Sequence, residues 1–147
     1  MSQVVLITGG SSGIGKAIGE YLFQKKYKVY GTSRDSSSYP NSVFPLINLD
    51  VTKEESIQEA VAELLEKEGR IDILINNAGV GITGPLEETP ASEVHYAMQV
   101  NFYGPMQMIN AILPSMRKQN SGKIINITSI AGYMGLPYRG IYSSSKA

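Results

Sequence analysis

The sequence contains no cysteine, and His95 is its only histidine. Without cysteine, the chain can form no disulfide, no thiolate metal site and no cysteine nucleophile. His95 stands in a helical pattern with no partner at metal-ligand spacing. We therefore expect no metal site and interpret His95 as a structural or exposed residue.

An excess of charge of either sign is also absent, because 13 Lys and Arg residues balance 13 Asp and Glu residues. This balance does not favour nucleic acid or an anionic membrane as a partner. No apolar run approaches the ~20 residues that cross a bilayer, and the N-terminus lacks the basic start of a signal peptide. We expect a cytoplasmic protein with one domain over residues 1–147, whose 42% hydrophobic content suffices for a core.

Short runs of β-branched apolar residues predict the strands of a sheet. None of these runs alternates cleanly between apolar and polar residues, which is typical of strands buried on both faces of a parallel sheet. Four strong runs and a weaker fifth, which Pro45 interrupts, are found at Val4–Thr8, Lys28–Ser33, Asp72–Asn76, Lys123–Ser129 and Val43–Leu49.

Helical patterns lie between these runs. One begins at Gly13, a second covers residues 52–69, a third covers 91–116 with an interruption near 101–105, and a last one begins at 142. Thr52 and Glu55 form a capping box at the start of the second helix, and Gly69 ends it. The alternation predicts an α/β doubly wound parallel sheet of the Rossmann type. Because residues 142–147 are too few for a stable helix alone, we expect this to be the N-terminal portion of a longer fold.

The stretch "TGGSSGIGKA" at residues 8–17 fits two phosphate-binding loops. From Gly10 it nearly matches the triphosphate loop G-x-x-x-x-G-K-[ST], but Ala17 lacks the hydroxyl that would bind Mg²⁺. From Gly9 it reads G-x-x-x-G-x-G, between a strand and a helix that are followed by a second strand. That context is the one in which backbone N–H groups bind the pyrophosphate of NAD or NADP. We therefore favour a dinucleotide over a triphosphate.

The end of the second strand selects between NAD and NADP. NAD-binding proteins usually place Asp or Glu there, to bond the ribose 2′-hydroxyl. Here Ser33 stands at that place and Arg34 follows, and a guanidinium suits a 2′-phosphate. Asp35 complicates the prediction, because a shift of one residue would bring a carboxylate to the site. We favour NADP(H) over NAD(H).

Five motifs occur in order along the chain: "TGGSSGIG", "NNAG" at Asn76–Gly79, Asn101, Ser129 and "YSSSK" at Tyr142–Lys146. Together they resemble the classical short-chain dehydrogenase/reductase family. The resemblance runs from Val4 to the last residue. It implies an NADP(H)-dependent oxidoreductase that interconverts a secondary alcohol and a ketone or aldehyde.

The chemistry of Tyr142 and Lys146 agrees with this. Four residues apart, they share one helix face, and a nearby ammonium group favours the ionised form of a phenol. Such a tyrosine can give a proton to a carbonyl oxygen while NADPH delivers hydride to the carbon. Ser129, expected at a strand end, can bond and polarise the same oxygen. By resemblance, Lys146 also bonds the nicotinamide ribose and Asn101 holds a water in a proton relay, with its amide exposed at the helix interruption.

The resemblance also implies which residues meet the cofactor, with Asp50 and Val51 against the adenine. Asp50 has an alternative interpretation as a neighbour of the helix cap at Thr52. The full expected set is Gly9, Ser11, Ser12, Gly13, Ile14, Gly15, Ser33, Arg34, Asp50, Val51, Asn77, Ala78, Gly79, Tyr142 and Lys146.

Two other functions stay open beside the oxidoreductase: a non-catalytic nucleotide-binding fragment or scaffold, and an NTPase that depends on Lys16. The stretches "VGITGPLEE" and "GYMGLPYRGIYSSSK" resemble the branch of the family that acts on lipid-like ketones, so the expected partner is a small carbonyl or alcohol substrate. The resemblance implies a homodimer or homotetramer for the full-length protein. Four methionines are expected in the core or at a subunit interface: Met98, Met106, Met108 and Met116.

Overall fold

A parallel sheet with the strand order β3-β2-β1-β4-β5 forms the centre of the computed structural model, which describes residues 2–147. The strands are β1 (Val4–Ile7), β2 (Lys28–Ser33), β3 (Leu46–Asn48), β4 (Ile73–Asn76) and β5 (Lys123–Asn126). The helices are α1 (Gly13–Gln24), α2 (Glu54–Glu68), α3 (Ala91–Met98), α4 (Gly104–Gln119) and α5 (Gly140–Lys146). The predicted doubly wound parallel sheet is confirmed.

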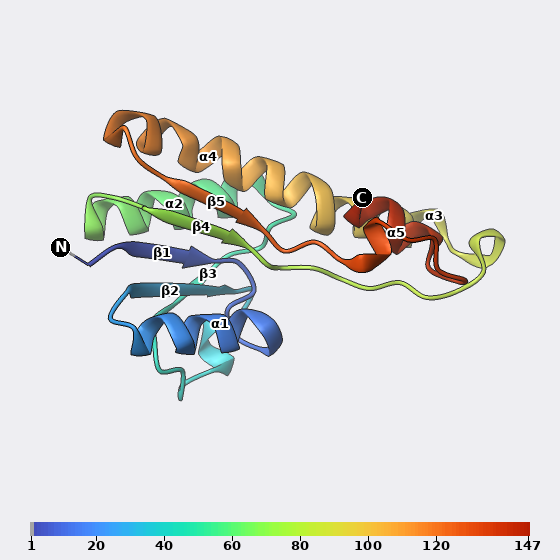
Figure 1. The fold of residues 1–147 in the computed structure, drawn as a ribbon, viewed down its shortest axis with the longest axis horizontal. Coiled ribbons are helices and arrows are strands. Elements are labelled where there is room, and N and C mark those ends of the chain that lie inside the picture. Colours follow the sequence, from blue (N-terminus) through green and yellow to red (C-terminus); the bar gives the residue numbers. More distant parts are fainter. Residues whose placement is uncertain (1) are drawn as a thin grey trace.

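Helices cover the two faces of the sheet unequally, with α2 and α4 on one face and α1 on the other (Figure 1). Successive side chains of β1 alternate between these faces: Val4 and Leu6 pack in the core under α2 and α4, while Val5 and Ile7 pack on the side of α1. All four side chains are at most 1% exposed. The carboxyl ends of the strands point toward α3 and α5 (Figure 1), and this edge of the sheet is where open α/β proteins bind ligands.

Four strands, β1, β3, β4 and β5, are shorter than the apolar runs predict. β1 ends at Ile7 and β5 ends at Asn126, so Thr8 and Ser129 lie outside the strands. The hydroxyl of Thr8 instead accepts the backbone N–H groups of Asn77 and Ala78, each at 3.0 Å. The side chain of Thr8 thereby holds the segment after β4 against the end of β1.

The capping box predicted at Thr52 is wrong. The helix α2 begins at Glu54, so Lys53 stands at the N-cap position and Thr52 lies one residue before it. The Thr52 hydroxyl donates to the Asp50 carboxylate at 2.7 Å. The other end is as predicted: Gly69 has φ of 72° and closes the helix in the left-handed region.

The interruption predicted near residues 101–105 is a wide turn of π-helix at Gln99–Tyr103, which joins α3 to α4 without ending the helix. Turns of this kind occur often at functional sites. Of the four methionines, Met108 and Met116 are buried in the core, whereas Met106 is 42% exposed and Met98 is half-buried. His95 is exposed, and residues 2–147 contain no cluster of side chains that could hold a metal.

No helix within residues 2–147 is both long enough and apolar enough to span a bilayer.

Asp72 connects the first strand to the start of the fourth. One carboxylate oxygen accepts the buried N–H of Val4 at 2.8 Å, and the Arg70 guanidinium donates to both oxygens. Burial by itself would raise the pKa of the Asp72 carboxyl, but the bonds from Arg70 and Val4 outweigh it and hold that pKa below its ordinary value.

We expect Asp72→Asn to lower the free energy of unfolding by about 1–3 kcal/mol at pH 7, since it disturbs a buried bond to the backbone. Because the folded pKa is depressed, this stabilisation is present above the unfolded value of about 4 and is lost as the pH falls through the folded pKa. Urea unfolding at pH 7 and pH 3 measures both. Glu20→Gln, which breaks the exposed 3.8 Å pair with Lys16, is the control, and an equal loss in both variants would contradict the prediction.

Candidate dinucleotide and catalytic site

The glycine-rich loop between β1 and α1 is held by both neighbouring strands. The Gly9 N–H donates to the Thr32 hydroxyl at 3.2 Å, and the Gly10 N–H donates to the Thr32 carbonyl at 3.0 Å. From the other side, the Asn77 amide donates to the carbonyl oxygens of Thr8 and Gly9 at 3.0 and 3.2 Å. The shape of the loop is therefore fixed by β2 and by the segment after β4.

Two glycines, Gly9 in this loop and Gly15 in the first turn of α1, occupy positions where a larger residue would be strained or would clash. Gly9 has φ of 66°, in the left-handed region. A Cβ atom on Gly15 would overlap the Gly9 carbonyl oxygen and the amide nitrogen of Asn77. The Ser12 side chain makes no capping bond at the start of α1, so the first N–H groups of the helix are open to an anion. This open, positively polarised helix end fits a pyrophosphate.

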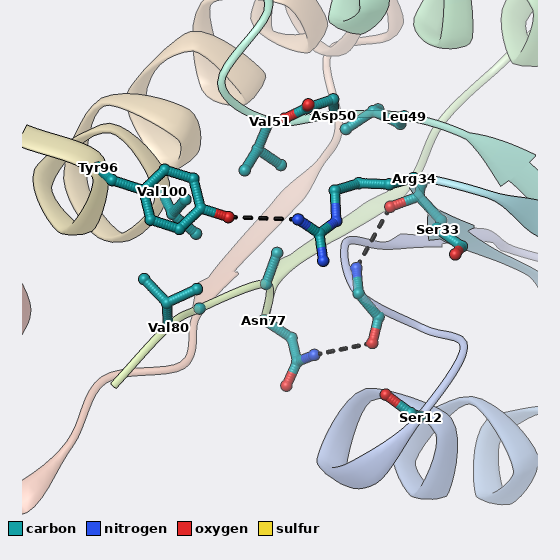
Figure 2. A pocket seen from close by; sticks show the side chains of 14 residues that line it. Ser12, Ser33, Arg34, Leu49, Asp50, Val51, Asn77, Val80, Tyr96 and Val100 are labelled. Atoms are coloured by element: carbon teal, nitrogen blue, oxygen red, sulfur yellow. Dashed lines mark hydrogen bonds between the residues drawn. The ribbon is translucent and has the colours of Figure 1, made fainter. Parts of the chain in front are cut away.

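Beside the loop lies a cavity of about 330 Å³. Its walls come from the ends of β1 and β2, the segments after β3 and β4, and the helix α3 with the turn after it (Figure 2). It is lined by Gly9, Ser12, Thr32, Ser33, Arg34, Leu49, Asp50, Val51, Asn77, Ala78, Gly79, Val80, Tyr96 and Val100.

Nine residues of the cavity wall belong to the set expected to meet the cofactor, so the structure brings them together: Gly9, Ser12, Ser33, Arg34, Asp50, Val51, Asn77, Ala78 and Gly79. Ser11, Gly13, Ile14 and Gly15 do not line the cavity, but they form the adjoining loop and first turn of α1, where Ile14 is 64% exposed. Tyr96 and Val100 were not predicted, although four-residue spacing in a helical pattern puts them on one face.

Asp35 does not bring a carboxylate to this cavity. Its side chain accepts the Ser37 N–H at 3.0 Å and the Ser38 hydroxyl at 2.6 Å, and so caps the short helical turn Ser36–Ser38. The bonds from Ser37 and Ser38 hold the pKa of the Asp35 carboxyl below its ordinary value. Arg34 points instead across the mouth of the cavity, where its Nη1 donates to the Tyr96 hydroxyl at 3.3 Å (Figure 2).

Asp50 lines the cavity and also bonds Thr52. Its Oδ1 accepts the Thr52 N–H at 3.0 Å and the Thr52 hydroxyl at 2.7 Å. Partial burial by itself would raise the pKa of the Asp50 carboxyl, but the bonds from Thr52, with the charges of Lys53 and Arg34, hold it below the ordinary value. Asp50 is therefore ionised at neutral pH.

Lys146 lies at the carboxyl edge of the sheet, where its ammonium group donates to the Ile127 carbonyl oxygen at 3.2 Å. A Cβ atom built on Gly79 would stand 3.1 Å from the Lys146 Nζ and 3.3 Å from the Asn101 Oδ1. The ammonium, the asparagine amide and the cavity wall at Gly79 are thus neighbours.

The amide of Asn101 is not exposed at the helix interruption, so that expectation is wrong. The side chain is buried, its Oδ1 accepts the Val80 N–H, and its Nδ2 donates to the Val80 carbonyl oxygen, both at 2.8 Å. The second hydrogen of Nδ2 goes to the buried Ser145 hydroxyl at 2.9 Å. Both amide hydrogens are therefore used to hold the segment after β4 and the helix α5 together.

Ser129 lies three residues beyond the end of β5 and caps the short helical turn Ile130–Gly132, so its expected place at a strand end is wrong. Its Oγ accepts the Ala131 N–H at 3.2 Å, which leaves the hydroxyl hydrogen for another acceptor. A Cβ atom on Gly132 would overlap the Lys146 carbonyl, so this turn packs directly on α5.

Tyr142 lies half-buried in the first turn of α5. The Arg139 guanidinium stands 5.6 Å from the centre of its ring. Among residues 2–147, no hydrogen bond joins the Tyr142 phenol to Ser129 or to Lys146. The structure brings the three onto one turn-and-helix unit, with the hydroxyl hydrogens free to meet a ligand.

Comparison with known proteins agrees with these features. The sequence model of the short chain dehydrogenase family matches residues 3–147. The chain is 49% identical over 144 residues to a 3-ketodihydrosphingosine reductase of Bacteroides thetaiotaomicron, covering 98% of this chain and 53% of the relative. It is 38% identical to estradiol 17-beta-dehydrogenase 1 of Rattus norvegicus, covering 99% and 46%. The chain therefore spans about half the length of these curated relatives.

A solved structure described as ElxO with NADP bound superimposes with a TM-score of 0.90 at 36% identity. It covers 99% of this chain and 63% of that one. The likeness covers nearly the whole chain, so the cavity beside the glycine-rich loop lies in a fold that holds NADP in that neighbour.

Proposed function

Because this chain belongs to the short-chain dehydrogenase family, we propose that it is the NADP(H)-binding portion of an oxidoreductase that interconverts a secondary alcohol and a ketone or aldehyde. The observation that carries the proposal is the position of the Lys146 ammonium. It stands one helical turn from Tyr142 and directly beside Gly79, which is part of the wall of the dinucleotide cavity.

The residues of the chain fit the cofactor and divide the reaction between them. The open N-terminus of α1 and the close approach at Gly15 suit the pyrophosphate, and bound NADPH would supply the hydride. The phenol of Tyr142 gives its proton to the ketone oxygen, and the charge of Lys146 stabilises the phenolate that remains. The free hydroxyl hydrogen of Ser129 donates to the same oxygen and polarises the carbonyl group.

The role of Asn101 in this proposal is to position other groups. With both amide hydrogens donated to Val80 and Ser145, its side chain fixes α5 relative to the cavity wall. A displaced helix would move Tyr142 and Lys146 together, and such misplacement lowers the rate steeply.

The proposed substrate is a lipid-like ketone. The loops that surround the Tyr142 region carry several exposed large apolar side chains, of which Ile130 is 68% exposed, Tyr133 93% and Leu136 38%. Two relatives named for sphingoid and steroid chemistry support the same class. Oxidation of NADPH, followed by absorbance, tests it with 3-ketodihydrosphingosine, a steroid ketone and a short water-soluble ketone.

The non-catalytic alternative is distinguished by the same assay. It predicts that both the full-length protein and the 147-residue chain bind NADPH and that neither turns over any ketone. Turnover by the full-length protein would reject it.

We expect Arg34→Asp to weaken NADPH binding by more than about tenfold and to leave NADH binding nearly unchanged, since a charged hydrogen bond is replaced by a repulsion with the 2′-phosphate. Fluorescence titration with each cofactor measures the ratio. Lys118→Asp, at the far end of α4, makes the same change of charge away from the cavity and is the control. If the ratio of the two affinities does not move, Arg34 does not select the cofactor.

A further inference from the structure

The mouth of the dinucleotide cavity is bridged by a contact between two elements that are distant in sequence. Arg34 extends from the end of β2 and Tyr96 from α3, and Figure 2 shows the guanidinium and the phenol hydroxyl meeting across the opening. The donor Nη1 and the acceptor oxygen are 3.3 Å apart, and both side chains are exposed. The bridge therefore lies on the solvent side of the cavity.

Within residues 2–147, the guanidinium forms no ion pair, although its charge helps to lower the pKa of the Asp50 carboxyl. The ion pairs there join Lys16 to Glu20, Lys28 to Glu68 and Arg70 to Asp72, and none includes Arg34. The two carboxylates nearest in sequence or in the cavity wall are engaged elsewhere: Asp35 with Ser37 and Ser38, and Asp50 with Thr52. The Tyr96 hydroxyl is a neutral acceptor, so the positive charge of Arg34 stays available to an anion.

Tyr96 is well placed to hold an arginine still. The next residue in α3, Ala97, is completely buried, and Val100 one turn later is 5% exposed in the same cavity wall. The helix is further fixed by Asn101, whose side chain accepts the Val80 N–H and donates to the Val80 carbonyl oxygen. The Tyr96 hydroxyl is thus carried by a rigid helix, whereas the Arg34 guanidinium is at the end of a long, flexible side chain.

We propose that Tyr96 is a positioning residue for Arg34, and that it raises the preference of the site for a dinucleotide with a 2′-phosphate. The inference rests on the proposed NADP(H) function. A guanidinium has five N–H donors, so one can stay on Tyr96 while others bond the phosphate oxygens. Fixing a mobile arginine costs rotamer entropy on binding, and the bond to Tyr96 removes part of that cost in advance. A 2′-hydroxyl, which has no charge, gains little from the same arrangement.

The test uses the adenosine halves of the two cofactors, 2′,5′-ADP for NADP and 5′-AMP for NAD, bound to the full-length protein and followed by calorimetry. We expect Tyr96→Phe, which removes only the hydroxyl, to weaken 2′,5′-ADP about three- to tenfold, the range of one net hydrogen bond, and to leave 5′-AMP unchanged. Tyr103→Phe, an exposed tyrosine that does not line the cavity, should change neither.

The double variant Arg34→Ala with Tyr96→Phe shows whether Tyr96 acts through Arg34. We expect it to bind 2′,5′-ADP no more weakly than Arg34→Ala alone. Additive losses, equal losses for both ligands, or tighter binding of 2′,5′-ADP by Tyr96→Phe would each overturn the inference. Failure of the proposed function looks different: Arg34→Ala alone would then leave the affinity for 2′,5′-ADP intact.

Discussion

Replacing Tyr142 with phenylalanine in the full-length protein should lower kcat about a thousandfold, within the range that a positioned general acid contributes. The phenol oxygen is the proton donor of the proposed reaction, and phenylalanine keeps the ring that packs beside Arg139. Affinity for NADPH should stay within about twofold, since the change removes only one hydroxyl at the edge of the site. Single-turnover oxidation of NADPH, together with a fluorescence titration of the cofactor, separates the two effects.

Tyr21→Phe is the matched control, because it removes the same atom from the exposed face of α1. Its kcat should equal that of the unaltered protein. Retained turnover by Tyr142→Phe would mean that the proton comes from another group. Loss of NADPH binding by the same variant would mean that the packing of α5 had been damaged.

Gly15→Ala should abolish dinucleotide binding and lower the free energy of unfolding by about 2–4 kcal/mol, as expected for an overpacked buried site. The added methyl group would overlap the Gly9 carbonyl and the Asn77 amide. Neither can move freely, because Gly9 is bonded to Thr32 and Asn77 is bonded to Thr8. Urea unfolding and an NADPH titration measure the two losses.

Two controls accompany this variant. Gly140 is the first residue of α5, and a Cβ atom there would meet nothing within 4 Å. Gly140→Ala should therefore leave the free energy of unfolding nearly unchanged. Lys16→Ala removes an exposed side chain whose ion pair within residues 2–147 is with Glu20, and NADPH binding should be retained. A strong dependence on Lys16, with hydrolysis of Mg-ATP, would instead support the triphosphate interpretation of the loop. Normal NADPH binding by Gly15→Ala would contradict the close approach seen in the structure.

The order of elements could be predicted because continuous apolar runs and helical stripes mark strands and helices independently of their neighbours. The exact ends could not. The cap predicted at Thr52 fails because α2 begins one residue later than the capping pattern requires, with Lys53 at the N-cap position. Ser129 likewise lies outside β5 and caps the turn Ile130–Gly132. That position depends on the packing of the turn against α5, which local sequence does not reveal.

The residues of the candidate site also fall into those that local sequence predicts and those that depend on distant parts of the chain. Residues close together in sequence, such as Gly9 in the loop and Gly15 in the first turn of α1, could be predicted from the local spacing between a strand and a helix. Tyr96 was missed because its hydrogen-bond partner, Arg34, lies 62 residues earlier in the chain, and only the folded structure brings the two together. The use of both amide hydrogens of Asn101 was hidden for the same reason, since its partners Val80 and Ser145 lie on separate segments.

The π-helical turn at Gln99–Tyr103 sets the rotational phase of one long helix that has two tasks. Tyr96 before the turn and Val100 within it line the cavity, and after the turn Met108 and Ile112 lie in the core under the sheet. Each residue of an α-helix turns the next by about 100°, so removing one residue here would rotate one face away from its partner. This segment should therefore tolerate substitutions better than insertions or deletions. A change of length would rotate the cavity-lining residues relative to the core residues of the same helix.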